Sequence, residues 1–274
     1  MQILDSDQPS VGMPPAAAPA TVSVQEPISR VSVLGVEIVD LSLPEAIKLL
    51  EHMLAAPVQQ SQTLFFVNAH TLNLAYENAA YRALLNQATC VFGDGTGVRW
   101  GARLKGVRLK ANLNGTDVVP ALMAATDARG YRYFLLGAMP PTVTGAAQAC
   151  LQHYPGWQLV GCHHGFSNEQ ETAAVIERIN RARPHMLLVG MGNPLQEQWI
   201  TRYRDQLDVR LCVGVGGLFN FLSGDVDRAP GWLRRMGHEW LHVLWRHKYK
   251  WRRYLLGNPK YLFRILRRRT DERF

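Results

Sequence analysis

No run of about 18 uninterrupted apolar residues occurs in this sequence of 274 residues, although 47% of the residues are hydrophobic. A helix that crosses a bilayer needs about 20 consecutive apolar residues, so we expect no transmembrane segment. Cysteine is also scarce: there are four cysteines, and no two of them form a C-x-x-C pair. This usage predicts reduced, buried thiols and argues against a disulfide framework.

Common cofactor motifs are missing too. The sequence contains no G-x-x-x-x-G-K-[ST] phosphate loop, and no early strand carries G-x-G-x-x-G followed by an acid. We therefore expect no nicotinamide or other cofactor. Cys162-His163-His164 has no second ligand cluster, and the Asp225-Val226-Asp227 triplet lies outside any predicted strand end. Zinc takes four ligands at characteristic spacings, so we expect no metal site.

Positive charge is concentrated at one end of the chain. Residues 232–274 contain thirteen Lys and Arg against three acids, a net charge of +10, whereas the whole chain carries +8. The rest of the chain is therefore close to neutral, at −2. Residues 1–30 are rich in Pro, Ala, Ser, Val and Gln and show no period, so we expect a disordered tail without a secretory signal.

The central region alternates short apolar runs with segments of helical spacing. The alternation around Gly35 in residues 30–40 predicts a β-hairpin, and Ser42-Leu43-Pro44-Glu45 predicts a capped helix that ends near Ala55. We then expect strands at residues 63–67, 90–92, 131–137, 157–162, 185–192 and 209–217. We expect helices at residues 70–87, 117–128, 142–154, 167–183 and 196–207.

This alternation predicts an α/β fold, with a Rossmann-like, mainly parallel sheet flanked by helices. We expect the catalytic domain to cover residues 31–230. A basic, amphipathic helical appendage should follow it at residues 231–274.

Ligands of open α/β sheets bind beyond the carboxyl ends of the strands, so the residues after each strand are candidates for the site. Small residues there let a ligand approach the backbone, and helix N-termini present N–H groups to anions. The combination predicts a phosphate-bearing ligand, although glycine after a strand is also an ordinary turn. The candidates from these loops are Asn68, His70, Gly95, Gly137, Gly192, Asn193, Gly216 and Gly217.

Asp94 is the one carboxylate at the mouth of a predicted strand, and glycines flank it on both sides. A carboxylate in this position can accept a proton from a hydroxyl nucleophile, and general-base assistance contributes roughly 10²–10⁴ in rate. The alternative is a local role, in which Asp94 forms an Asx-turn or caps the next helix.

Several stretches together resemble one protein family. They include "TCVFGDGTGV", "VGCHHGF", "VGMGNPLQEQWI" and "VGVGGLFNFLSGDVDRAPGW", and the matches run in order over about residues 31–262. These stretches resemble the WecG/TagA/CpsF glycosyltransferases, glycosyltransferase family 26. The resemblance implies a metal-independent, inverting transfer of a sugar from a UDP-sugar to a polyprenyl-diphosphate-linked acceptor, by an enzyme peripheral to the cytoplasmic face of the membrane.

The resemblance also implies roles for individual residues. Asp94 looks like the general base, Gln196 like a contact to the donor, and Asn68 like part of the first active-site loop. Gly216 and Gly217 would line the nucleotide pocket. Two departures from the family pattern, Phe166 and Asn220, should face the nucleotide.

The basic segment mixes tryptophan, leucine and tyrosine with Lys and Arg between residues 232 and 263. This composition suits an anionic membrane surface, to which each basic residue contributes about 1 kcal/mol. The alternative is a helix that packs on the domain through its aromatic side chains. We expect Arg252 or Arg253 to stabilise the diphosphates of a substrate, and deletion after Pro230 to leave a folded but inactive domain.

Two other functions remain open at this point. The basic segment permits a nucleic-acid-binding protein, although no recognised motif supports one. A nucleotide-binding scaffold without catalysis is the other alternative. The donor sugar is also open between glucose and an N-acetylmannosamine type, with a preference for a neutral hexose in exopolysaccharide assembly, and the chain could form a homo-oligomer.

Overall fold

The computed structural model describes residues 28–166, 168–226 and 256–271. Most of the predicted N-terminal tail and residues 227–255 of the basic segment, with Arg252 and Arg253, lie outside the described residues.

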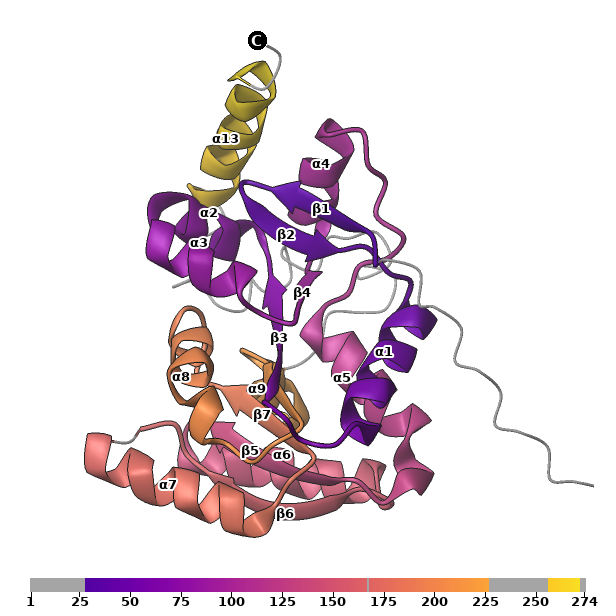
Figure 1. Cartoon of the computed structure of the whole chain (residues 1–274), viewed down its shortest axis with the longest axis vertical. Coiled ribbons are helices and arrows are strands. Elements are labelled where there is room, and N and C mark those ends of the chain that lie inside the picture. The colour runs from indigo at the N-terminus through magenta and orange to yellow at the C-terminus, as the bar shows by residue number, and fades with distance from the viewer. Residues whose placement is uncertain (1–27, 167, 227–255, 272–274) are drawn as a thin grey trace, which may run out of the picture.

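The centre of the molecule is a six-stranded sheet in which all neighbouring strands are parallel (Figure 1). In spatial order the strands are β4 (Cys90–Gly93), β3 (Gln62–Val67), β8 (Leu211–Gly214), β7 (Met186–Gly190), β5 (Arg132–Gly137) and β6 (Gln158–His163). The α/β, Rossmann-like prediction is therefore confirmed. β4 forms one edge of the sheet, and β3, the first of the six strands in the sequence, lies next to it.

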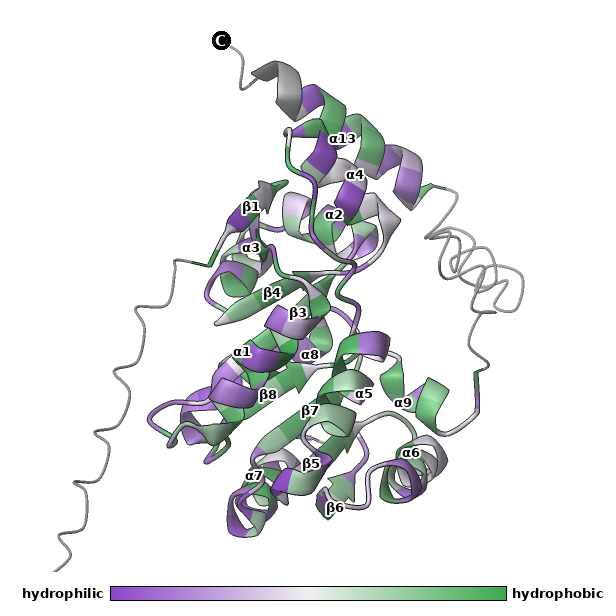
Figure 2. Cartoon of the chain, turned by 90° about the vertical axis from the view of Figure 1, so that its right-hand side faces the viewer, coloured by the Kyte–Doolittle hydropathy of each residue, from purple (hydrophilic) through white to green (hydrophobic). Residues whose placement is uncertain are grey.

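The strands are apolar on both faces, so the sheet separates two cores. Along β3, Phe65 and Val67 face one core, whereas Leu64 and Phe66 face the other. Side chains alternate across a strand, so a continuous apolar run requires helices on both faces. Figure 2 shows the strands as mainly hydrophobic and the outer helix faces as mixed.

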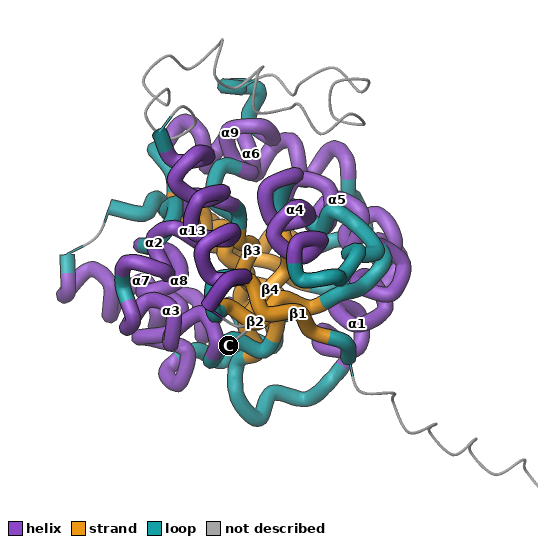
Figure 3. The backbone as a smooth tube through the Cα atoms, turned by 90° about the horizontal axis from the view of Figure 1, so that it is seen from above, coloured by secondary structure: helices purple, strands orange, loops and turns teal. Residues whose placement is uncertain are grey.

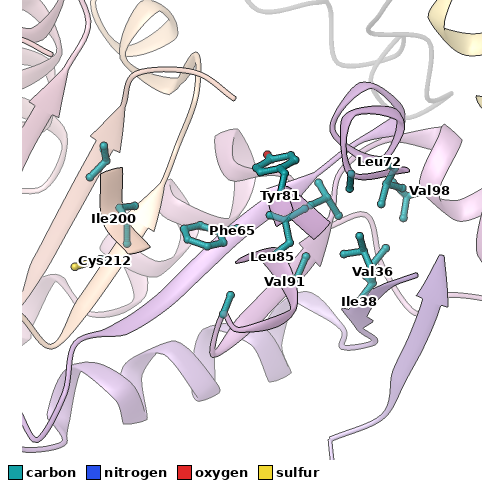
Figure 4. Packing of buried hydrophobic residues seen from close by; sticks show 14 of the residues in the cluster. Val36, Ile38, Phe65, Leu72, Tyr81, Leu85, Val91, Val98, Ile200 and Cys212 are labelled. Carbon is teal, nitrogen blue, oxygen red and sulfur yellow. The ribbon is translucent and has the colours of Figure 1, made fainter. Parts of the chain in front are cut away.

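In the described part of the chain, four helices cover the Leu64 face. They are α1 (Leu43–Ala55), α5 (Gly115–Ala125), α6 (Pro140–His153) and the short α9 (Leu218–Leu222). The Phe65 face is covered by α2 (Ala69–Glu77), α3 (Ala79–Asn86), α4 (Thr96–Leu104), α7 (Glu169–Ala182) and α8 (Leu195–Tyr203). Figure 4 shows part of this second core, where Tyr81 and Leu85 of α3 lie near Phe65 and Val91 of the sheet. Leu72 of α2 and Val98 of α4 lie together on the side of Val36 and Ile38. Two 3₁₀ turns, η1 (Asp127–Arg129) and η2 (Arg204–Gln206), complete the connections.

The predicted hairpin is present. Strands β1 (Arg30–Val33) and β2 (Val36–Val39) pair antiparallel through a turn in which Leu34 and Gly35 have φ of 52° and 82°. Left-handed φ at both central residues belongs to the tight turns that match strand twist. The hairpin packs against β4 and α4 on the Phe65 face.

The predicted cap of α1 is also present. The Ser42 backbone N–H donates to Glu45 Oε2 at 2.7 Å, and the Glu45 N–H donates to Ser42 Oγ. The Ser42 N–H, the Lys110 ammonium and the Ser42 hydroxyl all donate to the Glu45 carboxylate and lower its pKa to about 2.

Two helical regions differ from the prediction. The helix expected at residues 70–87 is broken at Asn78, whose Oδ1 accepts the Tyr81 N–H at 3.0 Å and starts α3. Helix α4 was not among the predicted helices, and only the alternative cap role of Asp94 implied a helix here. Its sequence TGVRWGARL contains two glycines and no side chain caps its start, so its local helix signals are weak.

Packing explains why α4 forms. A Cβ on Gly101 would lie 2.6 Å from the Tyr261 hydroxyl and 2.8 Å from Val33, so only glycine lets the partner elements come this close. Tyr261 belongs to α13 (Gly257–Asp271), which packs on α2 and α4 (Figure 3). Tyr261 and Ile265 of this helix are buried in the core of the Phe65 face.

Polar contacts also hold α13. Asn73 Nδ2 donates to the Gly257 carbonyl at 2.8 Å, and Arg264 donates to Asn73 Oδ1 at 2.9 Å and to Glu77 Oε1 at 2.6 Å. Residues 257–271, the last part of the predicted appendage, are therefore packed against the domain.

Candidate active site

The predicted site residues converge on one edge of the molecule, because the carboxyl ends of all six parallel strands lie there. They come from the loops after every strand. In spatial order these are Asp94 and Gly95 after β4, Asn68 and His70 after β3, Gly216 and Gly217 after β8, Gly192, Asn193 and Gln196 after β7, Gly137 at the end of β5, and Phe166 after β6.

The loop after β4 presents Asp94. Its N–H donates to the Val67 carbonyl at 2.8 Å, which ties it to the end of β3, and the residue is half-buried. The N-cap position of α4 is Gly95, not Asp94, and no side chain caps this helix. The alternative role of Asp94 as the cap of the next helix is therefore wrong.

Asn112 supports the Asp94 loop, and the sequence analysis did not single it out. Its Oδ1 accepts the Gly95 N–H at 2.6 Å, while Gly95 has a φ of 92° that favours glycine. The next residue, Leu113, donates its N–H to the Gly93 carbonyl at 3.1 Å. The segment before α5 therefore supports the Asp94 loop from below. No local sequence signal marks this contact, because 17 residues separate the two partners.

The loop after β3 lies beside the Asp94 loop. Asn68 Oδ1 accepts the N–H groups of His70 at 3.1 Å and of Thr71 at 3.2 Å, so Asn68 caps α2. A Cβ on Gly97 would lie 3.1 Å from the Ala69 Cβ, which places the first turns of α2 and α4 in contact. Asn68 thus fixes the direction in which this loop leaves the sheet.

Gln196 joins the two central loops. Its Oε1 accepts the N–H of Gly192 at 3.2 Å and the N–H of Gly216 at 2.8 Å, and the residue is 1% exposed. The loops after β7 and β8 are therefore held together by one buried amide. These contacts describe a positioning residue, and a direct contact of Gln196 with a donor stays a prediction.

Glu197 completes this network and is a second residue that the sequence analysis did not place in the site. Its Oε1 accepts from Gln196 Nε2 at 2.7 Å and from Asn193 Nδ2 at 2.5 Å, and its Oε2 accepts from the Tyr81 hydroxyl at 3.1 Å. Burial raises the pKa of this carboxyl above its ordinary value, although the three donors oppose the shift. The adjacent Gln-Glu pair in the VGMGNPLQEQWI stretch was the available signal.

Glycine is required at several of these positions, for two different reasons. Gly192 and Gly216 have φ of 82° and 53°, and a Cβ there would point into open space. Gly137 is buried with a φ of 127°, and a Cβ on it would lie 2.5 Å from the Gly190 backbone. Gly192 and Gly216 therefore border the open edge, whereas packing of β5 against β7 accounts for Gly137.

Two further candidates, Phe166 and Asn220, follow β6 and β8. Phe166 is 63% exposed, and its N–H donates to His164 Nδ1 at 3.3 Å. Asn220 lies in α9, and its N–H donates to the Gly217 carbonyl at 3.1 Å. Phe166 therefore lies at the end of the sheet farthest from Asp94, whereas Asn220 follows β8, two strands from β4.

Within the described ranges, no group of three or more His, Cys, Asp or Glu side chains could hold a metal ion. Asp225 of the Asp-Val-Asp triplet accepts from the Thr142 hydroxyl at 2.6 Å, which lowers the pKa of its carboxyl. None of the described helices is both long and apolar enough to cross a membrane.

The Asp94 loop and the loop after β8 lie apart along this edge of the sheet. The loops after β4 and β8 are two strands apart, which corresponds to roughly 10 Å at the usual strand spacing.

Comparison with known proteins identifies the family. The family model described as "Glycosyl transferase WecG/TagA/CpsF family" matches residues 31–274. The chain belongs to the WecG/TagA/CpsF family of glycosyl transferases. The resemblance stated from the sequence stretches is thereby confirmed.

Relatives of this WecG/TagA/CpsF protein include two enzymes named N-acetylglucosaminyldiphosphoundecaprenol N-acetyl-beta-D-mannosaminyltransferase. The one from Bacillus subtilis (strain 168) is 31% identical over 207 residues, which cover 76% of this chain and 80% of the relative. The one from Staphylococcus aureus (strain NCTC 8325 / PS 47) is 30% identical over 250 residues, which cover 89% of this chain and 95% of the relative.

Proposed function

We propose that this glycosyltransferase moves a sugar from a UDP-sugar to a polyprenyl-diphosphate-linked saccharide, with inversion at the anomeric carbon. The observation that carries the proposal is the position of Asp94 at the carboxyl edge of a parallel sheet, in a member of this family. The names of the two relatives, which act on a diphosphoundecaprenol-linked sugar, support the class of acceptor.

In the proposed reaction, Asp94 accepts the proton of an acceptor hydroxyl while that oxygen attacks the anomeric carbon of the donor sugar. The bond between this carbon and the UDP oxygen breaks, and UDP leaves with the bonding electron pair. The attack comes from the face opposite the leaving group, so the configuration inverts. The proton then passes from Asp94 to solvent.

The nucleotide is assigned to the loops after β7 and β8. Gly192 and Gly216 leave space there because they have no side chain, and Gln196 holds the two loops in register. The N–H groups of both glycines already donate to Gln196, so these particular groups support the pocket rather than the phosphates. We propose that the basic segment that contains Arg252 and Arg253 stabilises the negative charge that develops on the leaving UDP. Cations aimed at a developing charge stabilise the transition state.

For the donor we propose an N-acetylmannosamine-type sugar, because the named relatives transfer N-acetylmannosamine. Glucose is the alternative outcome of a panel of UDP-sugars. We further propose that the protein works at a membrane surface, where a polyprenyl-linked substrate resides. Phe263 and Leu266, exposed on α13 by 65% and 54%, support this location, as does the net charge of residues 232–274.

The decisive experiment compares Asp94→Asn with Asp208→Asn, an exposed aspartate outside the site. We expect Asp94→Asn to lower kcat by roughly 10²–10⁴ with a short-chain polyprenyl-diphosphate-sugar acceptor, because the general base is lost. Calorimetry should find UDP binding unchanged in both variants. Normal turnover by Asp94→Asn would refute the mechanism, and UDP binding without turnover in the unaltered protein would favour a non-catalytic scaffold.

A further inference from the structure

A cavity of about 140 Å³ lies next to the Asp94 loop, and the mechanism above does not use it. It is formed by the outer side of α4 and by the chain that turns back after this helix. Its lining residues are Thr96, Arg99, Trp100, Arg103, Arg108 and Leu109.

The cavity is strongly cationic. Arg99, Arg103 and Arg108 are all exposed, and none of them forms an ion pair with an acidic side chain in the part of the chain that the structure describes. Three guanidinium groups around one small volume repel each other, and an anion with several oxygens removes this repulsion. Guanidinium groups bind phosphate oxygens in a bidentate manner, so the chemistry favours a phosphate or diphosphate.

The fold places the three arginines together for identifiable reasons. Arg99 and Arg103 are four residues apart on α4 and therefore share one face of the helix. After α4 the chain reverses through Gly106, which has a φ of 83°, and the Val107 N–H donates to the Ala102 carbonyl at 3.0 Å. This reversal brings Arg108 back beside the helix, over the buried Leu109.

The cavity starts at the catalytic loop and leads away from the nucleotide loops. Thr96 is two residues from Asp94, and Arg103 lies seven residues farther along α4, which is about 10 Å at the helical rise. β4 is the edge strand, and α4 packs on the β1–β2 hairpin that lies against β4, whereas the nucleotide loops follow β8 and β7 nearer the middle of the sheet. An anion in the cavity would thus belong to the molecule that gives its proton to Asp94.

Exposed apolar side chains lie beside the arginines. Trp100, beside the arginines, is 51% exposed, and α13, which packs on α4, exposes Phe263. Figure 1 shows α4 and α13 at the same end of the molecule, opposite β6 and α7. Tryptophan beside cationic side chains is typical of surfaces that meet the boundary between lipid headgroups and acyl chains.

We propose that Arg99, Arg103 and Arg108 bind the diphosphate of the lipid-linked acceptor, and that Trp100 contacts the start of its polyprenyl chain. In such an acceptor the diphosphate joins the sugar to the lipid, and along the chain Asp94 is followed by Arg99, Trp100 and Arg103 of α4, so Trp100 lies between two of the arginines. This inference rests on the proposed function for the identity of the acceptor. The cavity itself selects the chemistry, a diphosphate joined to an apolar chain.

The kinetic test uses the triple variant Arg99→Gln/Arg103→Gln/Arg108→Gln and a water-soluble, short-chain polyprenyl-diphosphate-sugar without vesicles. We expect KM for this acceptor to rise at least about tenfold, since each charge-assisted contact contributes appreciably, while KM for the UDP-sugar stays unchanged. A charge-matched control, Arg129→Gln/Arg181→Gln/Arg202→Gln, removes three exposed arginines elsewhere and should leave both KM values unchanged. An unchanged acceptor KM in the cavity variant would overturn the proposal.

A binding test does not need turnover. Calorimetry with geranyl diphosphate should detect binding to the unaltered protein and to the control variant, with affinity lowered at least about tenfold in the cavity variant. Equal affinity in all three proteins would overturn the proposal even if no donor and acceptor pair were turned over. If no pair is turned over while geranyl diphosphate binding depends on the three arginines, the proposed function fails and the cavity assignment stands.

Anionic lipid headgroups are the other source of the same chemistry. Vesicles that contain phosphatidylglycerol but no acceptor should bind the cavity variant and the control variant equally. Loss of vesicle binding in the cavity variant alone, with an unchanged KM for the soluble acceptor, would show a headgroup site and overturn the proposal. Circular dichroism melting curves of all variants check that the fold is retained.

Discussion

At the scale of single residues, the polar side chains of the site serve mainly to hold loops. Asn68 caps α2, Asn112 supports Gly95, and Gln196 joins two glycine loops. Sequence reasoning located these loops because glycine and amide residues follow predicted strands. It could not separate a residue that touches a ligand from one that holds a loop, because amide side chains suit both tasks.

Asp94 and Glu197 show which kinds of residue sequence reasoning can find and which it cannot. Asp94 was prominent because it follows a strand between two glycines. Glu197 was not, because its importance comes from burial and from a Tyr81 hydroxyl that lies 116 residues away in the sequence. A buried carboxylate with three donors is visible only after the chain has folded.

His185 leads to a prediction about pH. Its Nδ1 accepts the Arg132 N–H at 2.9 Å, and burial, followed by the charges of Arg210 and Arg132, lowers its pKa from 6.5 to about 4. Between these values the unfolded chain binds a proton and the folded protein does not. Stability is therefore lost as the pH falls from 6.5 towards 4.

The measurement is a series of urea unfolding curves from about pH 7 to about pH 4.5. We expect His185→Asn, whose amide oxygen can still accept the Arg132 N–H, to lose less stability over this range than the unaltered protein. His52→Asn, at an exposed position, should keep the original pH profile. Identical profiles for the two variants would contradict the assignment.

At the scale of elements, sequence patterns predicted the sheet well and the helices around the site less well. Each expected strand is present, because six continuous apolar runs have no other stable arrangement than a sheet covered on both faces. The break at Asn78 was missed, since the apolar spacing continues through it. Helix α4 was missed because its formation depends on Tyr261, which lies 160 residues after Gly101.

Docking of α13 gives a prediction at this scale. Tyr261 is 1% exposed and its hydroxyl donates to the Gly97 carbonyl at 3.0 Å. We expect Tyr261→Ala to lower the free energy of opening of α13 by roughly 3 kcal/mol, because it removes a buried ring and this hydrogen bond. Hydrogen exchange of the amides in residues 257–267 measures the change.

Phe263 provides the matched control on the same helix. Its side chain is 65% exposed, so Phe263→Ala should change the opening free energy by less than about 0.5 kcal/mol. Equal exchange rates in the two variants would mean that α13 is not held through Tyr261.

At the scale of the whole molecule, the basic C-terminal region looks like one segment by its charge, but its last helix belongs to the domain by its packing. By composition, residues 232–274 form one basic segment, but α13 contributes Tyr261 and Ile265 to the core. Deletion of everything after Pro230 would therefore uncover apolar surface of α2 and α4. Substitution of Arg252 and Arg253 is a cleaner test of the basic segment than truncation.

The charge of +10 in this region leads to a prediction about membranes. Binding to phosphatidylglycerol vesicles should weaken strongly as NaCl rises from about 50 mM to about 500 mM, because salt screens exposed charges. Co-sedimentation measures the bound fraction, and neutral phosphatidylcholine vesicles serve as the control. Binding that is equal on both lipids and insensitive to salt would show that charge does not bring the protein to the membrane.

The position of β4 at the edge of the sheet affects how the two proposed substrates, which differ in solubility, reach the site. Asp94 and α4 lie at one margin of the sheet, whereas the glycine loops lie towards its middle. On the proposed function, a water-soluble nucleotide and a lipid anchored in its leaflet arrive from different directions and do not obstruct each other. The long hydrocarbon tail never needs to be pulled out of the bilayer, and spent UDP can diffuse into water while the lengthened lipid slides away sideways.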